Sequence, residues 1–330
     1  MKFKRILAAV LSCALIATSL MAVTGCNDSN GSGEKKEDGT YTVGICQLVQ
    51  HPALDAATEG FKKALTEKLG DKVTFDEQNA SGDSATCTTI VTQFVSSNVD
   101  LIMANATPAL QAAVSATPDI PILATSITEY GVALGIDGFN GKTGINVSGT
   151  SDLAPLDKQA AMFKELLPDA KNIGIIYCSN EANSKYQVNV VKSELEKAGL
   201  TVTEYSFADS NDIAQVVTKA CEEVDAFYIP TDNQCAKNAE LINSIAEPAK
   251  KPIIAGEEGI CKGCGIAALS ISYSTIGYNT GLMAYEILVN GKDPAEMEIQ
   301  YDDAPVYEYV AARCEAFGIT VPESYQAIAE

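Results

Sequence analysis

The sequence of 330 residues predicts an α/β protein with two Rossmann-like lobes, each built on a parallel sheet and joined by a hinge of several strands. Three observations predict this class. From Tyr41 onwards, short apolar runs alternate with longer amphipathic runs, which is the pattern of successive βα units. The alternation occurs twice, in two halves of similar length. Segments of small and β-branched residues join the halves, as a hinge between rigid bodies requires.

The first 25 residues are predicted to be an export signal and not a part of the fold. Basic residues precede an apolar stretch, and Val23-Thr24-Gly25-Cys26 resembles the bacterial lipobox, in which the cysteine is lipidated and becomes the mature N-terminus. The alternative is a membrane-spanning helix, because the stretch approaches the ~20 apolar residues that cross a bilayer. The polar, glycine-rich residues after Cys26 favour the lipoprotein, and residues 26–40 are predicted to be a flexible tether.

Acidic residues dominate the composition. The chain has 43 Asp and Glu against 23 Lys and Arg, which gives a formal net charge of −20. Removal of residues 1–25 would take away three basic residues and no acidic one, so the mature chain would carry −23. This charge argues against a nucleic-acid partner and against a second, polybasic contact with the membrane.

Residues 41–148 are predicted to form the first lobe. Within its first long helix, Phe61, Leu65 and Leu69 are spaced so that they form one apolar stripe, which would pack on the sheet. Strands are expected at residues 42–47, 73–77, 101–104, 120–124 and 144–147, and helices at 54–69, 84–97 and 108–116.

Residues 149–271 are predicted to form the second lobe by the same alternation. Residues 272–292 are expected to return to the first lobe as a helix at 276–289, and residues 293–330 to cross the hinge, beginning with a strand at 297–301. Two similar sheets joined in this way imply a cleft. In the second lobe, strands are expected at 172–177, 201–207, 226–229 and 252–255, and helices at 156–167, 183–198, 212–222 and 234–249.

Polar loops follow the predicted strands. In open α/β sheets, ligands bind beyond the carboxyl ends of the strands, so these loops hold the candidate binding residues. Each residue could instead be an ordinary helix N-cap. Together, helix N-termini that meet at one crevice would also form an anion site. The candidates are Gln47, His51, Thr107, Ser126, Glu129, Tyr130, Glu181, Asn183, Ser184, Asp232 and Asn233.

A buried Asp232 would be costly unless it were paired, and a ligand ammonium is a natural partner. A carboxylate at the helix N-termini and an ammonium at Asp232 would together indicate an amino acid. Four tyrosines are candidates for stacking on an aromatic ligand, although tyrosines near strand ends more often pack in the core. They are Tyr130, Tyr177, Tyr186 and Tyr273.

Cys261 and Cys264 are spaced so that they could form a disulfide or one half of a zinc site. The alternative is that they pack as small hydrophobic residues, as the other cysteines beyond Cys26 are expected to do. No second such pair exists, and the single histidine, His51, is far away in the sequence. We therefore expect no metal site and no cofactor.

Seven motifs between about Tyr41 and Tyr301 resemble, in order, those of the ABC-transporter substrate-binding family that includes tryptophan- and other aromatic amino-acid-binding lipoproteins. They are His51-Pro52-Ala53-Leu54-Asp55, Gln78-Asn79-Ala80-Ser81-Gly82-Asp83, Ala106-Thr107-Pro108-Ala109, Ile173-Gly174-Ile175-Ile176-Tyr177, Glu181-Ala182-Asn183-Ser184, Tyr228-Ile229-Pro230-Thr231-Asp232-Asn233 and Gly277-Tyr278-Asn279-Thr280-Gly281.

The resemblance implies a type I periplasmic-binding fold that closes two lobes on one ligand and delivers it to a membrane permease with its ATPase. Two loops depart from the family pattern. Glu129-Tyr130 stands where relatives with aromatic ligands often have an Asp-Pro step, and Glu257 lies in an unusual loop with the cysteine pair. Both loops should border the ligand side chain. Carried over by position, Thr107, Asn183, Ser184, Asp232 and Asn233 would hold the amino and carboxyl groups, with Gln47 and His51 at the cleft edge.

The expected protein is a lipid-anchored solute-binding protein on the extracytoplasmic face of a bacterial cell membrane. It would bind a zwitterionic ligand such as tryptophan, tyrosine or phenylalanine for an ABC importer, with the permease and ATPase as partners. The alternatives are a sensor whose closed cleft docks on a receptor, and the same fold with a nucleoside, sugar or peptide ligand. An enzyme is not expected, since no Gly-rich dinucleotide turn, GxxxxGK[ST] loop or GxSxG elbow occurs.

Overall fold

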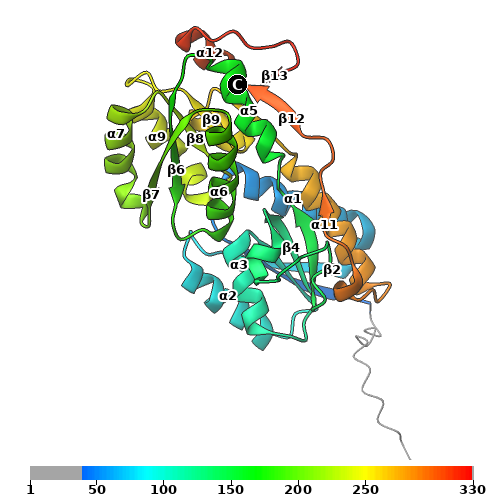
Figure 1. Cartoon of the computed structure of the whole chain (residues 1–330). Helices are drawn as coiled ribbons and strands as arrows, with labels where there is room; N and C mark the ends of the chain where they lie inside the picture. Colours follow the sequence, from blue (N-terminus) through cyan, green and yellow to red (C-terminus); the bar gives the residue numbers. More distant parts are fainter. Residues whose placement is uncertain (1–38, 329–330) are drawn as a thin grey trace, which may run out of the picture. The chain divides into compact units, whose positions relative to one another are not determined.

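The computed structural model describes residues 39–328, which belong to one compact unit (Figure 1). The predicted signal peptide, the lipidation site Cys26 and nearly all of the predicted tether lie outside the described residues. None of the helices in residues 39–328 combines the length and the apolar character needed to span a membrane.

The first sheet has six strands in the order β11-β5-β4-β3-β1-β2, and every pairing in it is parallel. Its two faces are both buried, because β1 directs Val43 and Ile45 to one hydrophobic cluster and Cys46 to another. The strands are β1 (Tyr41–Gln47), β2 (Val73–Asn79), β3 (Leu101–Asn105), β4 (Ile122–Ile127), β5 (Val147–Ser151) and β11 (Gln300–Tyr301).

Helices cover both faces of this sheet, and we call the whole the first lobe. The cluster around Val43 includes residues of α1 and α11, and the cluster around Cys46 includes residues of α2, α3 and α4. The helices are α1 (Pro52–Leu69), α2 (Ser84–Ser96), α3 (Thr107–Ala116), α4 (Tyr130–Leu134) and α11 (Tyr273–Leu288), with the short 3-10 helices η1 (Gly70–Lys72) and η3 (Pro294–Glu296).

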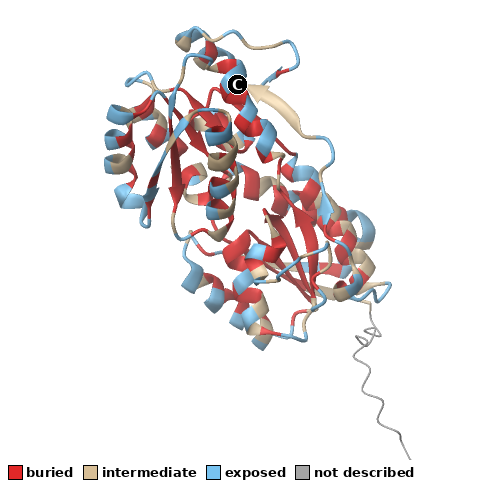
Figure 2. Ribbon diagram, in the orientation of Figure 1, coloured by how far each residue is buried: buried red, intermediate tan, exposed pale blue. Residues whose placement is uncertain are grey.

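The second sheet has seven strands in the order β13-β12-β10-β9-β8-β6-β7, and only the β10–β12 pair is antiparallel. Figure 2 shows its central strands buried, as are those of the first sheet. The strands are β6 (Asn172–Cys178), β7 (Thr201–Phe207), β8 (Ala226–Ile229), β9 (Ile253–Ala255), β10 (Ala267–Ser270), β12 (Val306–Tyr309) and β13 (Gln326–Ala327).

The second lobe consists of this sheet and its helices. One face packs against α5 and α6, and the other against α7, α9 and α10. The prediction of two mostly parallel sheets is therefore confirmed. The helices are α5 (Leu156–Leu166), α6 (Ala182–Lys197), α7 (Ile213–Glu223), α8 (Asn233–Lys237), α9 (Ala239–Ala246), α10 (Glu258–Cys264) and α12 (Ala311–Phe317), with the 3-10 helix η2 (Ser210–Asp212).

The described chain passes between the two lobes at three places. Residues 152–155 lead from β5 to α5, residues 271–272 from β10 to α11, and residues 302–305 from β11 to β12. Three short connections allow the lobes to rotate about one axis while each keeps its own core, which is the arrangement of a hinge.

Helices α1 and α11 are in direct backbone contact. A Cβ atom added at Gly277 would overlap the carbonyl oxygen of Ala57, and one added at Gly281 would lie 2.5 Å from the carbonyl oxygen of Phe61. On the α1 side, a Cβ at Gly60 would lie 2.9 Å from the backbone nitrogen of Tyr278. Only glycine permits this approach, which brings the returning helix into the first lobe.

Three predicted elements differ clearly from those observed. The strand expected at 297–301 is only the two-residue β11. The strand expected at 144–147 is β5, at Val147–Ser151, because hydroxyl groups let its polar residues be buried: Thr150 Oγ1 lies 3.1 Å from Thr125 Oγ1 and 2.9 Å from Thr280 Oγ1. The helix expected at 234–249 is divided into α8 and α9 at Asn238.

Candidate functional site

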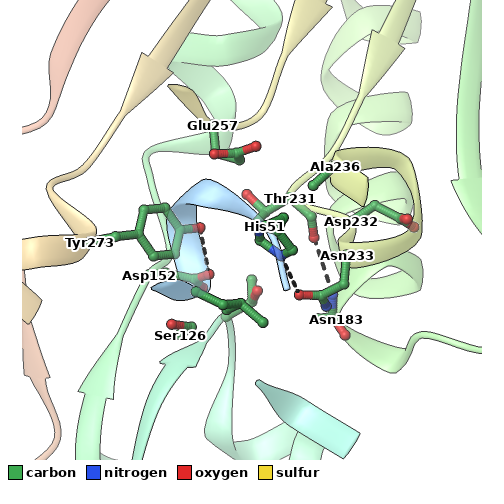
Figure 3. Close-up of a pocket in the computed structure, with 12 residues that line it drawn as sticks. His51, Ser126, Asp152, Asn183, Thr231, Asp232, Asn233, Ala236, Glu257 and Tyr273 are labelled. Carbon is green, nitrogen blue, oxygen red and sulfur yellow. Dashed lines mark hydrogen bonds between the residues drawn. The ribbon is translucent and has the colours of Figure 1, made fainter. Parts of the chain in front are cut away.

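A cavity lies where both lobes and the hinge meet, at the carboxyl ends of the strands (Figure 3). The first lobe contributes the start of α1 and the end of β4. The second lobe contributes the start of α6, the β8–α8 loop and the residue before α10. The lining residues are His51, Leu54, Ser126, Thr128, Asp152, Asn183, Thr231, Asp232, Asn233, Ala236, Glu257 and Tyr273.

Three hydrogen bonds join the lobes beside this cavity. His51 Nε2 lies 3.2 Å from Asn233 Oδ1, Gln234 Nε2 donates to the carbonyl oxygen of Gly82 at 3.4 Å, and Lys237 Nζ donates to that of Ser81 at 3.3 Å. Each bond pairs a group of the first lobe with a residue of α8. The cavity is therefore enclosed by a closed arrangement of the lobes.

Unpaired polar atoms are concentrated in the cavity. Among the described residues, five buried side-chain atoms have no hydrogen-bond partner, and four of them belong to lining residues. Buried polar groups almost always find partners in native proteins. The cluster is thus a place where a polar ligand can supply the missing hydrogen bonds. The four atoms are His51 Nδ1, Ser126 Oγ, Asp152 Oδ1 and Asn183 Oδ1.

Backbone strain occurs at the edge of the cavity. Ser126 has a φ of 58° and Ala106, at the end of the neighbouring strand, has a φ of 89°, although neither residue is glycine. Such conformations cost about 1–3 kcal/mol and are found mainly at functional sites. At Ser126 the strained backbone accompanies a buried hydroxyl group without a partner.

The carboxylates at and behind the cavity wall are buried, and none of the twelve lining residues is Lys or Arg. Burial raises the pKa of Asp152 and of Asp232. Burial, with the nearby charge of Asp232, raises the pKa of Glu181 to about 8, and burial raises that of Glu257 to about 7. Buried acids are thus the main ionisable groups at the cavity.

Asp232 has a different role from the predicted one. Its Oδ1 accepts a hydrogen bond from the backbone nitrogen of Cys235 at 2.8 Å, and its Oδ2 accepts bonds from the backbone nitrogen of Cys178 and the Ser184 hydroxyl, both at 2.7 Å. Figure 3 shows its carboxylate directed away from the other labelled side chains. This geometry contradicts the expected pairing of Asp232 with a ligand ammonium, because donors within its own lobe satisfy the carboxylate.

The helix starts of the second lobe are also occupied by its own acids. Glu181 accepts hydrogen bonds from the backbone nitrogens of Asn233 at 3.0 Å and Gln234 at 3.1 Å, and Glu257 accepts from those of Gly259 and Ile260. The starts of α8 and α10 are thus not available to a ligand carboxylate. The start of α6, where Asn183 lines the cavity, has no side-chain cap.

Six of the predicted site residues line the cavity and six do not. Gln47 bonds to Asp55 and Thr58 below the start of α1, and Glu129 caps α4. The Tyr130 hydroxyl donates to the carbonyl oxygen of Ala124 at 2.9 Å in the core of the first lobe. Thr107 is buried at the start of α3, and Glu181 and Ser184 lie behind the wall. The lining ones are His51, Ser126, Asn183, Asp232, Asn233 and Glu257.

The sequence did not indicate Asp152 as a site residue. It lies in the crossing from β5 to α5, and its Oδ2 accepts a hydrogen bond from the Tyr273 hydroxyl at 2.9 Å. Tyr273 is the one stacking candidate among the four tyrosines that lines the cavity. The feature of the sequence that could have identified Asp152 is its position as an acidic residue at the end of a polar hinge segment. Leu54, Thr128, Thr231 and Ala236 are the other lining residues that were not predicted.

Of the alternatives for Cys261 and Cys264, the structure shows packing and no disulfide. Both thiols are free and buried in α10, where they belong to the hydrophobic cluster of the second lobe. Cys264 Sγ lies 3.4 Å from the carbonyl oxygen of Ile260, as expected for a thiol that bonds within its own helix. Both residues therefore serve as packing residues.

Comparisons with known proteins agree on one family. The model of the family described as ABC transporter substrate binding protein matches residues 42–330. A tyrosine-binding protein from Clostridioides difficile (strain R20291) is 38% identical over 307 residues, which cover 90% of this chain and 88% of that protein. The fold of an ABC domain from Streptococcus pneumonia in complex with L-Trp matches with a TM-score of 0.82 at 34% identity, over 86% of this chain and 97% of that one.

A further structure allows the arrangement of the lobes to be compared. The ligand-free, open structure of CD0873, a substrate binding protein from Clostridium difficile, is 38% identical and covers 88% of this chain and 99% of that one, yet its TM-score is 0.67. The L-Trp complex matches better at lower identity. The lobes of this chain are therefore arranged more like those of the complex, in agreement with the three hydrogen bonds between them.

The type I periplasmic-binding fold is confirmed by more distant structures. A leucine-binding protein from Thermotoga maritima, 15% identical, matches with a TM-score of 0.59 over 78% of this chain and 86% of that one. At this identity the likeness concerns the fold alone. The nearer matches are solute-binding proteins and not enzymes.

Proposed function

This chain belongs to the family of ABC transporter substrate-binding proteins, and from that premise we propose that it is a lipoprotein that binds an aromatic amino acid for an ABC importer. The observation that carries the proposal is the closed cavity with four unpaired polar atoms. A zwitterion brings both donors and acceptors into such a place, whereas a purely apolar ligand would leave these atoms without partners.

An amino acid matches the chemistry of the two kinds of surface in the cavity. Ser126 and Thr128 offer hydroxyl groups in the first lobe, close to the strained strand ends, and these are suited to a carboxylate. Leu54, Ala236 and the ring of Tyr273 supply apolar contact for a side chain. The relatives support an aromatic side chain, since one is named for tyrosine and another holds L-Trp.

The sequence outside residues 39–328 supports the remaining parts of the proposal. The lipobox-like Val23-Thr24-Gly25-Cys26 and the polar residues after it would anchor the protein on the outer face of the membrane, where a permease and its ATPase take up the ligand. A sensor would need the same anchor and the same closed cleft. The importer is favoured by the family to which the chain belongs.

We expect L-tyrosine, L-tryptophan or L-phenylalanine to raise the melting temperature by several degrees, because a ligand that binds only the folded state stabilises it by mass action. The measurement is a thermal-shift panel on the mature protein, with L-leucine, uridine and myo-inositol as controls. The chain has no tryptophan, so added L-tryptophan can also be followed by its own fluorescence. A shift with uridine or myo-inositol alone would overturn the ligand class.

Uptake tests the importer. Deletion of the gene should abolish high-affinity uptake of the amino acid that the panel identifies, and a Cys26→Ser variant should be released from the membrane. Normal uptake together with a lost transcriptional response to that amino acid would favour the sensor instead.

We further expect that removal of the two peripheral hydrogen bonds between the lobes weakens binding about threefold to tenfold, because apparent affinity follows the fraction of closed molecules. The variant is Gln234→Ala combined with Lys237→Ala, measured by calorimetry with the amino acid from the panel. Preference among ligands should not change, since neither residue lines the cavity. Lys219→Ala, an exposed lysine in α7, is the matched control. Unchanged affinity in the double variant would contradict the role of these bonds.

A further inference from the structure

The unpaired atoms of the cavity are mainly hydrogen-bond acceptors. The amide nitrogen of Asn183 already donates to Glu181 Oε2 and to the carbonyl oxygen of Thr231, both at 3.1 Å, so the atom left over is its oxygen. At Asp152, Oδ2 is bonded to Tyr273 and Oδ1 is left over. A carboxylate and an amide oxygen can only accept. Two of the four missing partners must therefore be donors.

His51 presents a third acceptor. The amide nitrogen of Asn233 donates to Glu181 Oε2 at 2.7 Å, which directs Asn233 Oδ1 towards His51 Nε2. An oxygen acceptor in that position requires the proton on Nε2. Burial lowers the pKa of His51, so the imidazole is neutral and its Nδ1 carries a lone pair. This Nδ1 is among the unpaired atoms that line the cavity.

The carboxylate of Asp152 has no cationic partner. Asp152 is 4% exposed, and no hydrogen bond or ion pair joins it to a Lys or Arg of the described chain. Burial raises its pKa, as expected for a carboxylate that lacks a cation. Asp232 and Glu181, by contrast, are satisfied by protein donors. Asp152 is the carboxylate at this cavity that still has an oxygen to offer.

We propose that Asp152 binds the ammonium group of the ligand, with His51 Nδ1 and Asn183 Oδ1 as the further acceptors in the same cavity. An ammonium brings a positive charge and three N–H donors, which match in number and kind the three acceptor atoms, one of which belongs to a carboxylate. The inference rests on the proposed function and makes it more specific: the ligand class is defined by a primary amine, and Asp152 replaces Asp232 as its partner.

Figure 3 shows how Asp152 is held. The Tyr273 hydroxyl bonds to it from the start of α11, so the carboxylate is fixed by residues next to two of the three hinge crossings. A ligand that bonds to Asp152 is thus joined to the hinge itself, while Asn183 lies in the second lobe and His51 in the first. One ammonium group would then contact all the parts that move on closure.

The test compares three probes by calorimetry with the mature protein: L-tyrosine, tyramine, which lacks the carboxylate, and 3-(4-hydroxyphenyl)propionate, which lacks the amine. We expect tyramine to bind measurably and the propionate to bind at least about 100-fold more weakly than L-tyrosine, since a buried charge pair is lost. Equal affinity for the propionate and L-tyrosine would overturn the proposal. If L-tyrosine itself does not bind, the choice of an aromatic ligand in the proposed function has failed, and the same amine-deletion pair is made for the amino acid that binds.

Asp152→Asn tests the residue. The substitution should weaken the binding of L-tyrosine about 100-fold and leave the affinity for the propionate nearly unchanged. The preference for a ligand with an amine would then disappear. If Asp152 only supported the wall of the cavity, its substitution would weaken the binding of both probes alike, and that result would overturn the assignment. Asp157→Asn, an exposed acid five residues further along the chain, is the matched control and should behave as wild type. Thermal unfolding of each variant verifies that it is folded before binding is compared.

Discussion

A Gly277→Val variant is expected not to reach a stable fold. A Cβ at this position would overlap the carbonyl oxygen of Ala57, so α1 and α11 would have to separate. They cannot separate freely, because Phe61 and Leu65 of α1 and Met283 of α11 belong to one cluster on the same face of the first sheet. We expect a loss of about 4 kcal/mol or more in the free energy of unfolding, at the upper end for overpacked cores.

Urea unfolding followed by circular dichroism measures this loss. Thr275→Val, in the same helix but on its exposed side, introduces the same side chain and should change stability only slightly. Wild-type stability of Gly277→Val would mean that the two helices are not in backbone contact, and the description of the first lobe would have to be revised.

Replacement of Asp232 by alanine is expected to destabilise the second lobe by about 3–5 kcal/mol. Three buried donors would lose their acceptor: the backbone nitrogens of Cys178 and Cys235 and the hydroxyl of Ser184. The first of these is at the end of β6 and the second in α8, so the carboxylate joins a strand to a helix. Its loss would loosen the loop that lines the cavity.

Thermal unfolding without ligand is the measurement that separates this role from ligand binding. Asp83→Ala is a matched control, because Asp83 also caps a helix, but at the exposed start of α2, and its loss should have a much smaller effect. If Asp232→Ala kept wild-type stability and lost only ligand affinity, the original expectation that Asp232 faces the ammonium would be restored.

The fold could be predicted because its strands are apolar enough to be recognised. Runs such as Leu101–Asn105 and Asn172–Cys178 alternate with amphipathic helices, and that order predicts two parallel sheets. Strand β5 was displaced in the prediction because it is rich in Ser and Thr, whose hydroxyl groups are satisfied only by residues such as Thr125 and Thr280 from other elements. The sequence of one segment does not show which residues of other elements will be its hydrogen-bond partners.

The candidate site was predicted in part. The position of loops after strands located His51, Ser126, Asn183 and Asn233, since parallel strands all end at the same edge. The acids were harder to assign. An acid that caps a helix and an acid that faces a ligand look alike in sequence, and only the position of Cys178, 54 residues away, shows that Asp232 is the former. The role of Asp152 could not be predicted, because an acid in a polar hinge segment looks like an ordinary connecting residue until Tyr273 and the cavity are placed beside it.

The buried acids of the second lobe have a consequence for which compounds this protein does not bind. Burial raises the pKa of Asp232, Glu181 and Glu257, and the lining residues of the cavity include no Lys or Arg. A keto acid or a phosphorylated sugar that enters the open cleft therefore finds no positive group to offset its charge. Such compounds should be rejected because their charge would be buried without a partner, with no dedicated contact needed. In a mixture of nutrients, the cleft of this protein would then not be occupied by such anions.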